Sequence, residues 1–169
     1  DLIDGDTSVG VQPIWKLYEL WCFLKVKKMV AGILGIDLRN PEDLQFVHET
    51  TKNSANPFFG GDLTGTVKYD NPKNGDIIEI GYQYSFNYRG DKDGFKSMTV
   101  EQKPDIVMHI HKKDNITLTY LFDAKYRVHG EDDPRITKVE DFPVEDTLNQ
   151  LHRYRAAIYY GPETSTNLR

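Results

Sequence analysis

The chain has 169 residues, of which 38% are hydrophobic and 28% charged, and a formal net charge of −5. This balance predicts one packed domain spanning residues 1–169 and excludes a disordered chain. No apolar run approaches the ~20 residues that span a bilayer, the acidic N-terminus is no signal peptide, and Cys22 is the single cysteine. We therefore expect no membrane span and no internal disulfide, and a cytoplasmic location.

A long helix is predicted from about Pro13 to Val30, with Gly32 and Gly35 ending it. Its apolar residues surround most of the cylinder, which predicts burial on more than one side. Lysines near its predicted end would complement the helix dipole. Glu19 lies within this apolar pattern and has two readings. It is either a half-exposed carboxylate paired with a lysine or an acid that points inward at a charged centre.

The middle of the chain is predicted to be rich in strands. Residues 37–61 suggest a short helical turn followed by a loop, and residues 64–69 a short strand. After a turn at 71–75, residues 77–88 form the clearest strand, because apolar and polar residues alternate. Residues 89–101 suggest a charged loop. The alternation places one set of side chains, Glu79, Gln83, Ser85 and Asn87, opposite an aromatic stripe, Tyr82, Tyr84, Phe86 and Tyr88.

The aromatic stripe also has two readings. A stripe of this kind usually forms sheet core, which is the reading we favour here. The alternative is a β-rich ligand-binding protein, in which Tyr82, Tyr84 and Tyr88 would be exposed in a groove.

The C-terminal half is predicted as a hairpin, an acidic loop and a helix. A strand over 104–111 and a tight turn at 112–115 lead into a second strand, 120–126. Residues 128–143 form the acidic loop, and the helix runs from about 144 to 160 with acids in its first turn. The order is helix, three or four antiparallel strands, helix.

The predicted hairpin carries a candidate site for metal-dependent phosphodiester chemistry. Asp105 begins its first strand, and alternation places Asp123 and Lys125 on one face of the second. Buried charges need each other or a metal, and two carboxylates from neighbouring strands offer the hard oxygen ligands that Mg²⁺ prefers. A lysine beside them can orient a water molecule or stabilise charge on phosphorus. An acidic chain argues mildly against nucleic-acid binding, although metal ligands are themselves acids.

Pro104-Asp105 followed by Asp123-Ala124-Lys125 resembles the PD-(D/E)XK nuclease superfamily. The resemblance implies an α/β, restriction-endonuclease-like fold, in which a mixed β-sheet is flanked by helices around an α-β-β-β-α core. Gln150 and Tyr154, four residues apart on the last helix, match the glutamine–tyrosine element of RecB-type members. In that family this helix face points at the active site and the nucleic acid, so we expect Gln150 and Tyr154 to contact substrate and Arg153 to contact phosphate.

Four ordered motifs over about residues 14–160 together look like the nuclease domain of McrC-like (DUF2357-type) proteins. They are Tyr18-Glu-Leu-Trp-Cys22, Lys103-Pro-Asp105, Phe122-Asp-Ala-Lys-Tyr-Arg127 and Leu151-His-Arg-Tyr-Arg-Ala156. The resemblance implies a metal-dependent DNA endonuclease with Mg²⁺ as cofactor and Mn²⁺ as a substitute. Asp105, Asp123 and Glu19 would be its metal ligands and, with Lys125, its catalytic residues.

The same resemblance implies a partner and a wider context. McrC-like nucleases act in modified-DNA restriction and antiviral defence with an AAA+ GTPase or ATPase subunit like McrB, and this chain has no phosphate-binding loop of its own. The abrupt start, and an end soon after Gly161-Pro162, predict an excised fragment of a longer protein. The alternative function is a catalytically inactive nuclease-fold scaffold that docks the AAA+ motor.

Overall fold

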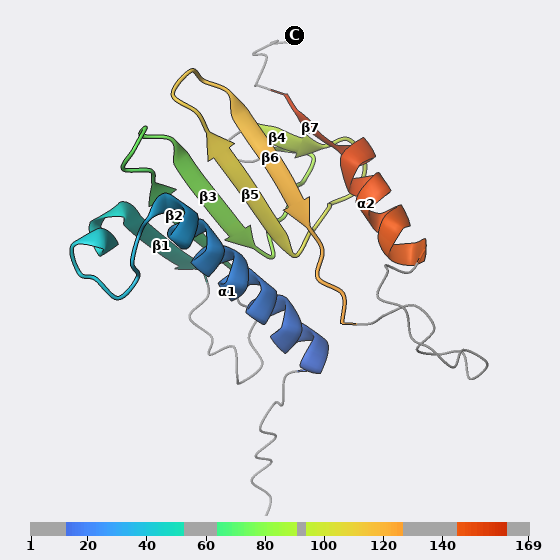
Figure 1. The fold of residues 1–169 in the computed structure, drawn as a ribbon. Coiled ribbons are helices and arrows are strands. Elements are labelled where there is room, and N and C mark those ends of the chain that lie inside the picture. The colour runs from blue at the N-terminus through green and yellow to red at the C-terminus, as the bar shows by residue number, and fades with distance from the viewer. Residues whose placement is uncertain (1–12, 53–63, 91–93, 127–144, 162–169) are drawn as a thin grey trace, which may run out of the picture.

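A computed structural model describes residues 13–52, 64–90, 94–126 and 145–161. These residues form two helices, a short 3-10 helix and seven strands (Figure 1). In chain order the elements are α1 (Ile14–Leu34), η1 (Asp43–Phe46), β1 (Val47–Lys52), β2 (Thr64–Asp70), β3 (Ile77–Tyr82), β4 (Phe95–Ser97), β5 (Ile106–His111), β6 (Thr117–Phe122), α2 (Glu145–Ala157) and β7 (Ile158–Tyr160).

Five of the strands form one antiparallel sheet in the order β1-β2-β3-β5-β6, and β4 pairs with β7 in a second, two-stranded sheet. In Figure 1 the arrowheads of β3 and β6 point to the same end of the large sheet, and β5 starts from that end. The predicted order of helix, antiparallel strands and helix is therefore confirmed. No described helix is long and apolar enough to cross a membrane.

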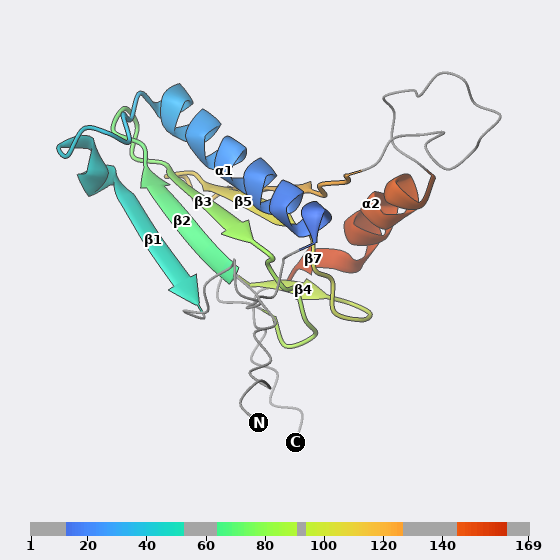
Figure 2. The same ribbon diagram turned by 90° about the horizontal axis from the view of Figure 1, so that it is seen from below.

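Helix α1 lies along one face of the large sheet (Figure 2), where alternate strand residues meet it. One stripe of the helix is buried there, and it includes Phe23, Ala31 and Leu34. The prediction that α1 is buried on more than one side is wrong, because Trp15, Trp21, Leu24, Met29 and Ile33 are all exposed. A helix on one sheet face buries one stripe only, and no described residues cover the other. The buried core of this face consists of Phe23, Ala31, Leu34, Ile36, Val67, Tyr69, Ile78, Ile80, Tyr82 and Ile106.

The end of α1 also differs from the prediction. The helix passes through Gly32 and ends at Leu34, and Gly35 then adopts a left-handed conformation with φ of 79°. The amide of Gly35 and that of the next residue, Ile36, donate to carbonyl groups of the last turn. The last turn has no basic residue, because the predicted lysines lie in the middle of the longer helix.

The predicted strand over 77–88 is too long. Strand β3 ends at Tyr82, and Gln83 has a φ of 53°. Beyond it, Tyr84 and Phe86 pack with Val107 in a second core on the other face of the sheet. The reading of the stripe as core is confirmed for Tyr82 and Phe86, which are buried, whereas Tyr88 is exposed.

Three short strands lie where loops or helix were expected. Strand β1 (Val47–Lys52) falls within the predicted loop over 37–61, and β4 falls within the predicted loop over 89–101. The predicted last helix ends early, at Ala157, and β7 follows it directly. None of these strands shows the alternation of a half-buried strand, because β1 is polar and the other two have three residues each.

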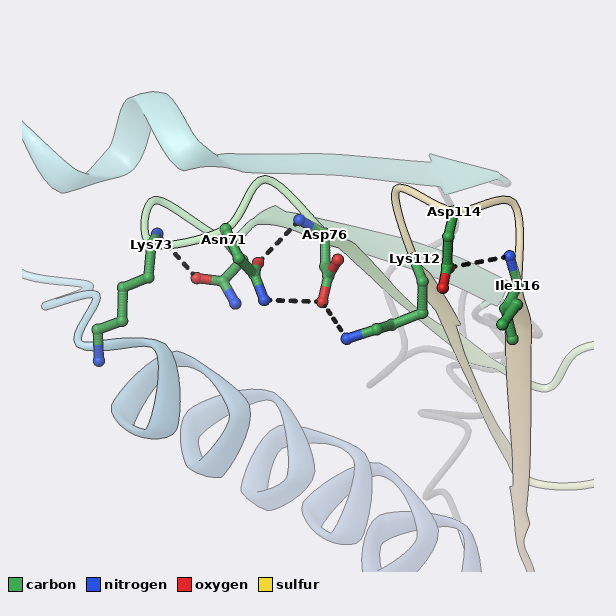
Figure 3. Close-up of polar contacts among 7 residues, drawn as sticks. Asn71, Lys73, Asp76, Lys112, Asp114 and Ile116 are labelled. Carbon is green, nitrogen blue, oxygen red and sulfur yellow. Dashed lines mark hydrogen bonds and ion pairs between the residues drawn. The ribbon is translucent and has the colours of Figure 1, made fainter.

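At the far end of the sheet, the β2–β3 and β5–β6 turns are joined by an ion pair (Figure 3). Lys112 Nζ lies 2.6 Å from Asp76 Oδ2, and that oxygen also accepts a hydrogen bond from Asn74 Nδ2 at 2.8 Å. The side chain of Asn71 accepts from the amide of Lys73 at 3.0 Å, which closes the β2–β3 turn. These contacts fix the two turns of the sheet that lie opposite the candidate site.

Candidate active site

The two predicted strand acids lie at the same end of the large sheet. Asp105 precedes β5 by one residue and Asp123 follows β6 by one residue. Strands β5 and β6 are antiparallel, with Ile106 paired to Phe122, so the hairpin brings these two positions together. The amide of Ala124 donates a hydrogen bond of 2.7 Å to Asp105 Oδ2. The carboxylate of Asp105 is therefore held against the backbone just after Asp123.

Asp123 has an almost fully buried side chain. Only 1% of its side chain is exposed, and Lys125 Nζ lies 2.7 Å from its Oδ2. Among the described residues, neither carboxylate oxygen of Asp123 has a hydrogen bond of normal geometry. A buried carboxylate with a single cationic neighbour retains lone pairs for a further ligand. Lys125 is itself partly exposed and can reach solvent or substrate.

Glu19 approaches the same end of the sheet from α1. Its residue is 8% exposed, so the structure supports the inward reading of this acid. Gln83 Nε2 donates to Glu19 Oε2 at 3.0 Å and lies 3.4 Å from Asp105 Oδ1. The side chain of Gln83 thus joins the helix acid to the strand acid.

Burial raises the pKa of two of these acids. The pKa of Glu19 rises to about 7, mainly through burial and then through the charge of Asp105, while Lys125 opposes the rise. The pKa of Asp105 rises to about 6 for the same main reason. The amide of Ala124 opposes that second rise, and the charge of Asp123 adds to it. The acids therefore crowd negative charge into one poorly solvated place, where a cation would be favoured.

The last helix contributes the predicted glutamine–tyrosine pair. Gln150 Nε2 donates to the Tyr154 hydroxyl at 2.5 Å, and that hydroxyl donates to the carbonyl oxygen of Lys103 at 3.2 Å. Tyr154 is buried, and its pKa is raised chiefly by burial, with the charges of Asp123 and Asp105 adding to the rise. This helix face is thus anchored beside the segment that leads into Asp105. Arg153, next to the pair, is exposed.

A family model described as the PD-(D/E)XK nuclease superfamily matches residues 16–169 of this chain. The chain belongs to the PD-(D/E)XK nuclease superfamily. Its sheet and flanking helices are consistent with the restriction-endonuclease-like fold that the sequence predicted. Membership supports a nuclease-type, hydrolytic function, and nucleases of this superfamily generally use divalent metals such as Mg²⁺. Searches of the curated proteins and of the solved structures gave no match.

The donor set suits the divalent metal that the PD-(D/E)XK superfamily implies. Asp105 and Asp123 supply carboxylate oxygens, and those of Asp123 are buried without a normal hydrogen bond. Within residues 13–52, 64–90, 94–126 and 145–161, no three His, Cys, Asp or Glu residues form a group that could hold a metal ion. Glu19, Asp105 and Asp123 therefore do not form a site that could hold a metal ion with three protein ligands. Mg²⁺ needs only one or two carboxylates, since waters and substrate phosphates complete its shell.

Gln83 is the site residue that the sequence did not reveal. Alternation assigned it to the sheet face opposite Tyr82, away from α1, whereas the structure directs its side chain to Glu19. No sequence signal marks the change, because glutamine is not a residue that favours a left-handed backbone. Arg127, the last residue of the third motif, lies outside the described residues. The histidines of β5 are sheet residues, since the ring of His109 is buried and bonds to Thr119 at 2.9 Å.

Proposed function

We propose that this chain is a Mg²⁺-dependent DNA endonuclease that hydrolyses phosphodiester bonds. The observation that carries the proposal is the meeting of Asp105 and Asp123 at one end of the sheet, with Lys125 2.7 Å from Asp123. Two acids that can hold a divalent cation, with a lysine beside them, suit metal-assisted phosphodiester hydrolysis. The superfamily match over residues 16–169 supports the same reaction class.

In this mechanism the acids bind the cation and the lysine acts on the reacting groups. Asp105 and Asp123 are the metal ligands, and Glu19 supports them directly or through water. When bound there, Mg²⁺ would supply Lewis-acid chemistry that polarises a phosphoryl oxygen and lowers the pKa of a water molecule. Lys125, which is partly exposed, donates hydrogen bonds to that water or to the scissile phosphate and stabilises the developing negative charge.

The last helix shapes the substrate side of the site. Gln150 bonds to Tyr154, and Tyr154 bonds to the backbone carbonyl of Lys103, two residues before Asp105. This contact holds the helix at a fixed position relative to the acids. Arg153 lies exposed next to Tyr154, where a guanidinium group can bind a phosphate.

We further propose that the protein is the nuclease component of a McrBC-like system acting on modified DNA. The support is the likeness of four ordered motifs to McrC-like nucleases. The chain has no phosphate-binding loop of its own, so nucleotide hydrolysis in such a system falls to an AAA+ partner subunit. The acidic net charge of −5 suits a nuclease that relies partly on that partner to hold DNA.

The test is nicking of supercoiled plasmid DNA with Mg²⁺ or Mn²⁺, by the chain alone and with its AAA+ partner. Asp123→Ala and Lys125→Ala should each abolish nicking, because one loses a metal ligand and the other the group that acts on water or phosphate. Asp114→Ala, in the turn at the far end of the sheet, is the matched control and should nick normally. Full activity in either site variant would refute the mechanism.

The alternative is a nuclease-fold scaffold that docks an AAA+ motor without cleaving DNA. The observation that favours it is the lack of a three-ligand group among the described residues. Titration with Mn²⁺ separates the two functions. A nuclease should bind the ion in a way that depends on Asp105, whereas a scaffold should show no such binding in either wild type or Asp105→Ala.

A further inference from the structure

Gln83 has an unusual backbone for its residue type. Among the described non-glycine residues, only Gln83 and Asn115 have a positive φ, at 53° and 64°. Asn115 lies in the β5–β6 turn, and asparagine adopts this conformation readily. Glutamine adopts it less readily, so a left-handed backbone at this residue is conformationally unfavourable. The contacts that this conformation creates must therefore offset its cost.

The left-handed backbone at Gln83 breaks the alternation of the strand, so the side chains from Gln83 onward point to the opposite faces of the sheet from those expected. Tyr82 faces α1, so regular alternation would send Gln83 to the opposite face and Tyr84 back toward α1. Instead Gln83 reaches Glu19 of α1, and Tyr84 packs on the opposite face with Phe86. The ring of Tyr84 lies over Gly81, where an added Cβ would come within 2.7 Å of Tyr84 Cδ2. The conformation of Gln83 thus directs its amide toward the acids.

Three hydrogen-bond contacts fix Gln83 between the two acids. Its backbone amide donates to the carbonyl oxygen of Asp105 at 2.8 Å, which extends the β3–β5 pairing one step past Tyr82. Its side-chain nitrogen donates to Glu19 Oε2 at 3.0 Å and lies 3.4 Å from Asp105 Oδ1. A primary amide carries two hydrogens on that nitrogen, so it can serve both carboxylates at once.

We propose that Gln83 is a positioning residue that holds the Glu19 carboxylate of α1 in register with Asp105 of the sheet. The inference rests on the proposed nuclease function, because it assigns Gln83 to the same site. Gln83 is neutral and its nitrogen only donates, so it can lie between two acids without adding charge. It contacts one carboxylate oxygen of Glu19 and leaves the second for other ligands. The carboxylates of Glu19 and Asp105 are thereby held next to each other before a metal or DNA arrives.

A purely conformational role for residue 83 makes a different prediction. If the chain needed only a left-handed backbone here, glycine would supply it without strain and would keep the amide that bonds to Asp105. Gln83→Gly therefore removes the side-chain bridge and preserves the backbone. Gln83→Glu keeps the shape of the side chain and replaces its donor with a third carboxylate. Asn115→Gly is the matched control, because it makes the same backbone change far from the site.

The experiment measures plasmid cleavage, Mn²⁺ affinity by calorimetry and the side-chain amide signals of ¹⁵N-labelled protein. Gln83→Gly should lower turnover and weaken Mn²⁺ binding by about 10–100-fold, as losses of groups that orient metal ligands do. Gln83→Glu should also lower turnover, because its carboxylate repels Glu19 and Asp105 instead of bridging them. The KM for DNA should not change, and Asn115→Gly should match wild type. The amide signals absent from Gln83→Gly should also shift in Glu19→Gln, which shows the bridge directly.

Two of these measurements do not depend on nuclease activity. If wild type fails to cleave DNA, the proposed function fails, while the amide signals and Mn²⁺ affinity still decide the role of Gln83. Wild-type Mn²⁺ affinity in Gln83→Gly, or Gln83 amide signals unchanged in Glu19→Gln, would overturn the proposal. If Gln83→Gly does not fold, Gln83→Asn replaces it, because asparagine tolerates the backbone and its amide is one methylene too short.

Discussion

A single buried carboxylate, Glu19, links stability and function in this chain. It lies on an apolar helix stripe with Phe23, where leucine would pack without any electrostatic cost. Its pKa of about 7 means that, without a metal, Glu19 keeps its proton at pH values where a free carboxyl is already ionised. Such a residue destabilises the fold once it is ionised, which is common at sites that need charge for function.

The first prediction is that Glu19→Gln stabilises the metal-free protein at alkaline pH. A carboxyl with a raised pKa makes the folded state bind more protons, so the free energy of unfolding falls as pH rises between the two values. For Glu19 this interval runs from 4.5 to about 7. Ionisation of Glu19 over this interval lowers the free energy of unfolding by on the order of 3 kcal/mol. Glutamine does not ionise, so the variant avoids this loss, and its side-chain oxygen can still accept the hydrogen bond from Gln83.

Urea denaturation in EDTA at pH 4, 6 and 8 measures this effect. The variant should exceed wild type at pH 8, and the difference should vanish near pH 4, where Glu19 is protonated in both states. Glu42→Gln, at an exposed carboxylate, is the control and should show no such pattern. A variant no more stable than wild type at pH 8 would contradict the assignment of burial to Glu19.

Among the elements, the two turns at the far end of the sheet hold the central strands in register. Asp76 in the β2–β3 turn binds Lys112 in the β5–β6 turn, so one ion pair joins the ends of two neighbouring hairpins (Figure 3). The hydrogen bond from Lys112 lowers the pKa of Asp76. A lowered carboxyl pKa contributes stability above the unfolded value of 3.8, and that stability is lost as pH falls through the lower folded value.

The second prediction is therefore that Asp76→Asn destabilises the protein at neutral pH and that its deficit shrinks below about pH 4. The amide keeps the turn geometry and loses the charge that attracts Lys112. Thermal unfolding at pH 3, 5 and 7 measures the deficit, with Glu42→Gln, at an exposed carboxylate outside both turns, as control. A deficit that stays constant from pH 7 to pH 3 would show that the ion pair is not its cause.

Sequence patterns predicted the helices and strands in which apolar residues recur regularly. They failed at the end of β3, where the backbone angle of one residue ends the strand. The β5–β6 hairpin and α2 were predicted because alternation, a turn signal and first-turn acids agree there. The bounds of the second strand were wrong, because β6 spans Thr117–Phe122 and not 120–126, so Asp123 and Lys125 follow the strand. The strand over 77–88 was extended by six residues because the sequence alternates straight through Gln83. Tertiary contacts to Glu19 and Asp105 set the angle at Gln83, and no local pattern encodes them.

The same distinction applies to the candidate site. Asp105, Asp123 and Lys125 could be located because the hairpin register follows from local sequence. The inward aim of Glu19 could not be settled, since a pattern that surrounds the whole helix does not tell which stripe meets the sheet. The exposed apolar residues of α1, such as Trp21 and Ile33, show that composition alone overstates burial.

For DNA binding by the whole molecule, the positions of the charged residues matter more than the net charge of −5. The chain has 21 Lys and Arg against 26 Asp and Glu, so it repels DNA on average. Any contact with phosphate must then depend on a few local cations near the site. Helix α2 carries two exposed arginines, Arg153 and Arg155, on either side of the buried Tyr154. We propose that Arg153 makes the phosphate contact.

The last prediction is that Arg153→Ala weakens DNA binding at all sequences alike and reduces its salt dependence. Each phosphate contact that a protein makes releases about one counterion, so removing one should reduce the slope of log affinity against log salt by about 0.9. Binding is measured by fluorescence anisotropy of a labelled duplex from 50 to 200 mM salt, about the range over which such contacts are resolved. EDTA is present so that no cleavage occurs. Arg39→Ala is the control, because Arg39 lies beyond the far end of α1 and bonds to Asp37. An unchanged slope in Arg153→Ala, together with unchanged affinity, would show that α2 does not contact the DNA backbone through this residue.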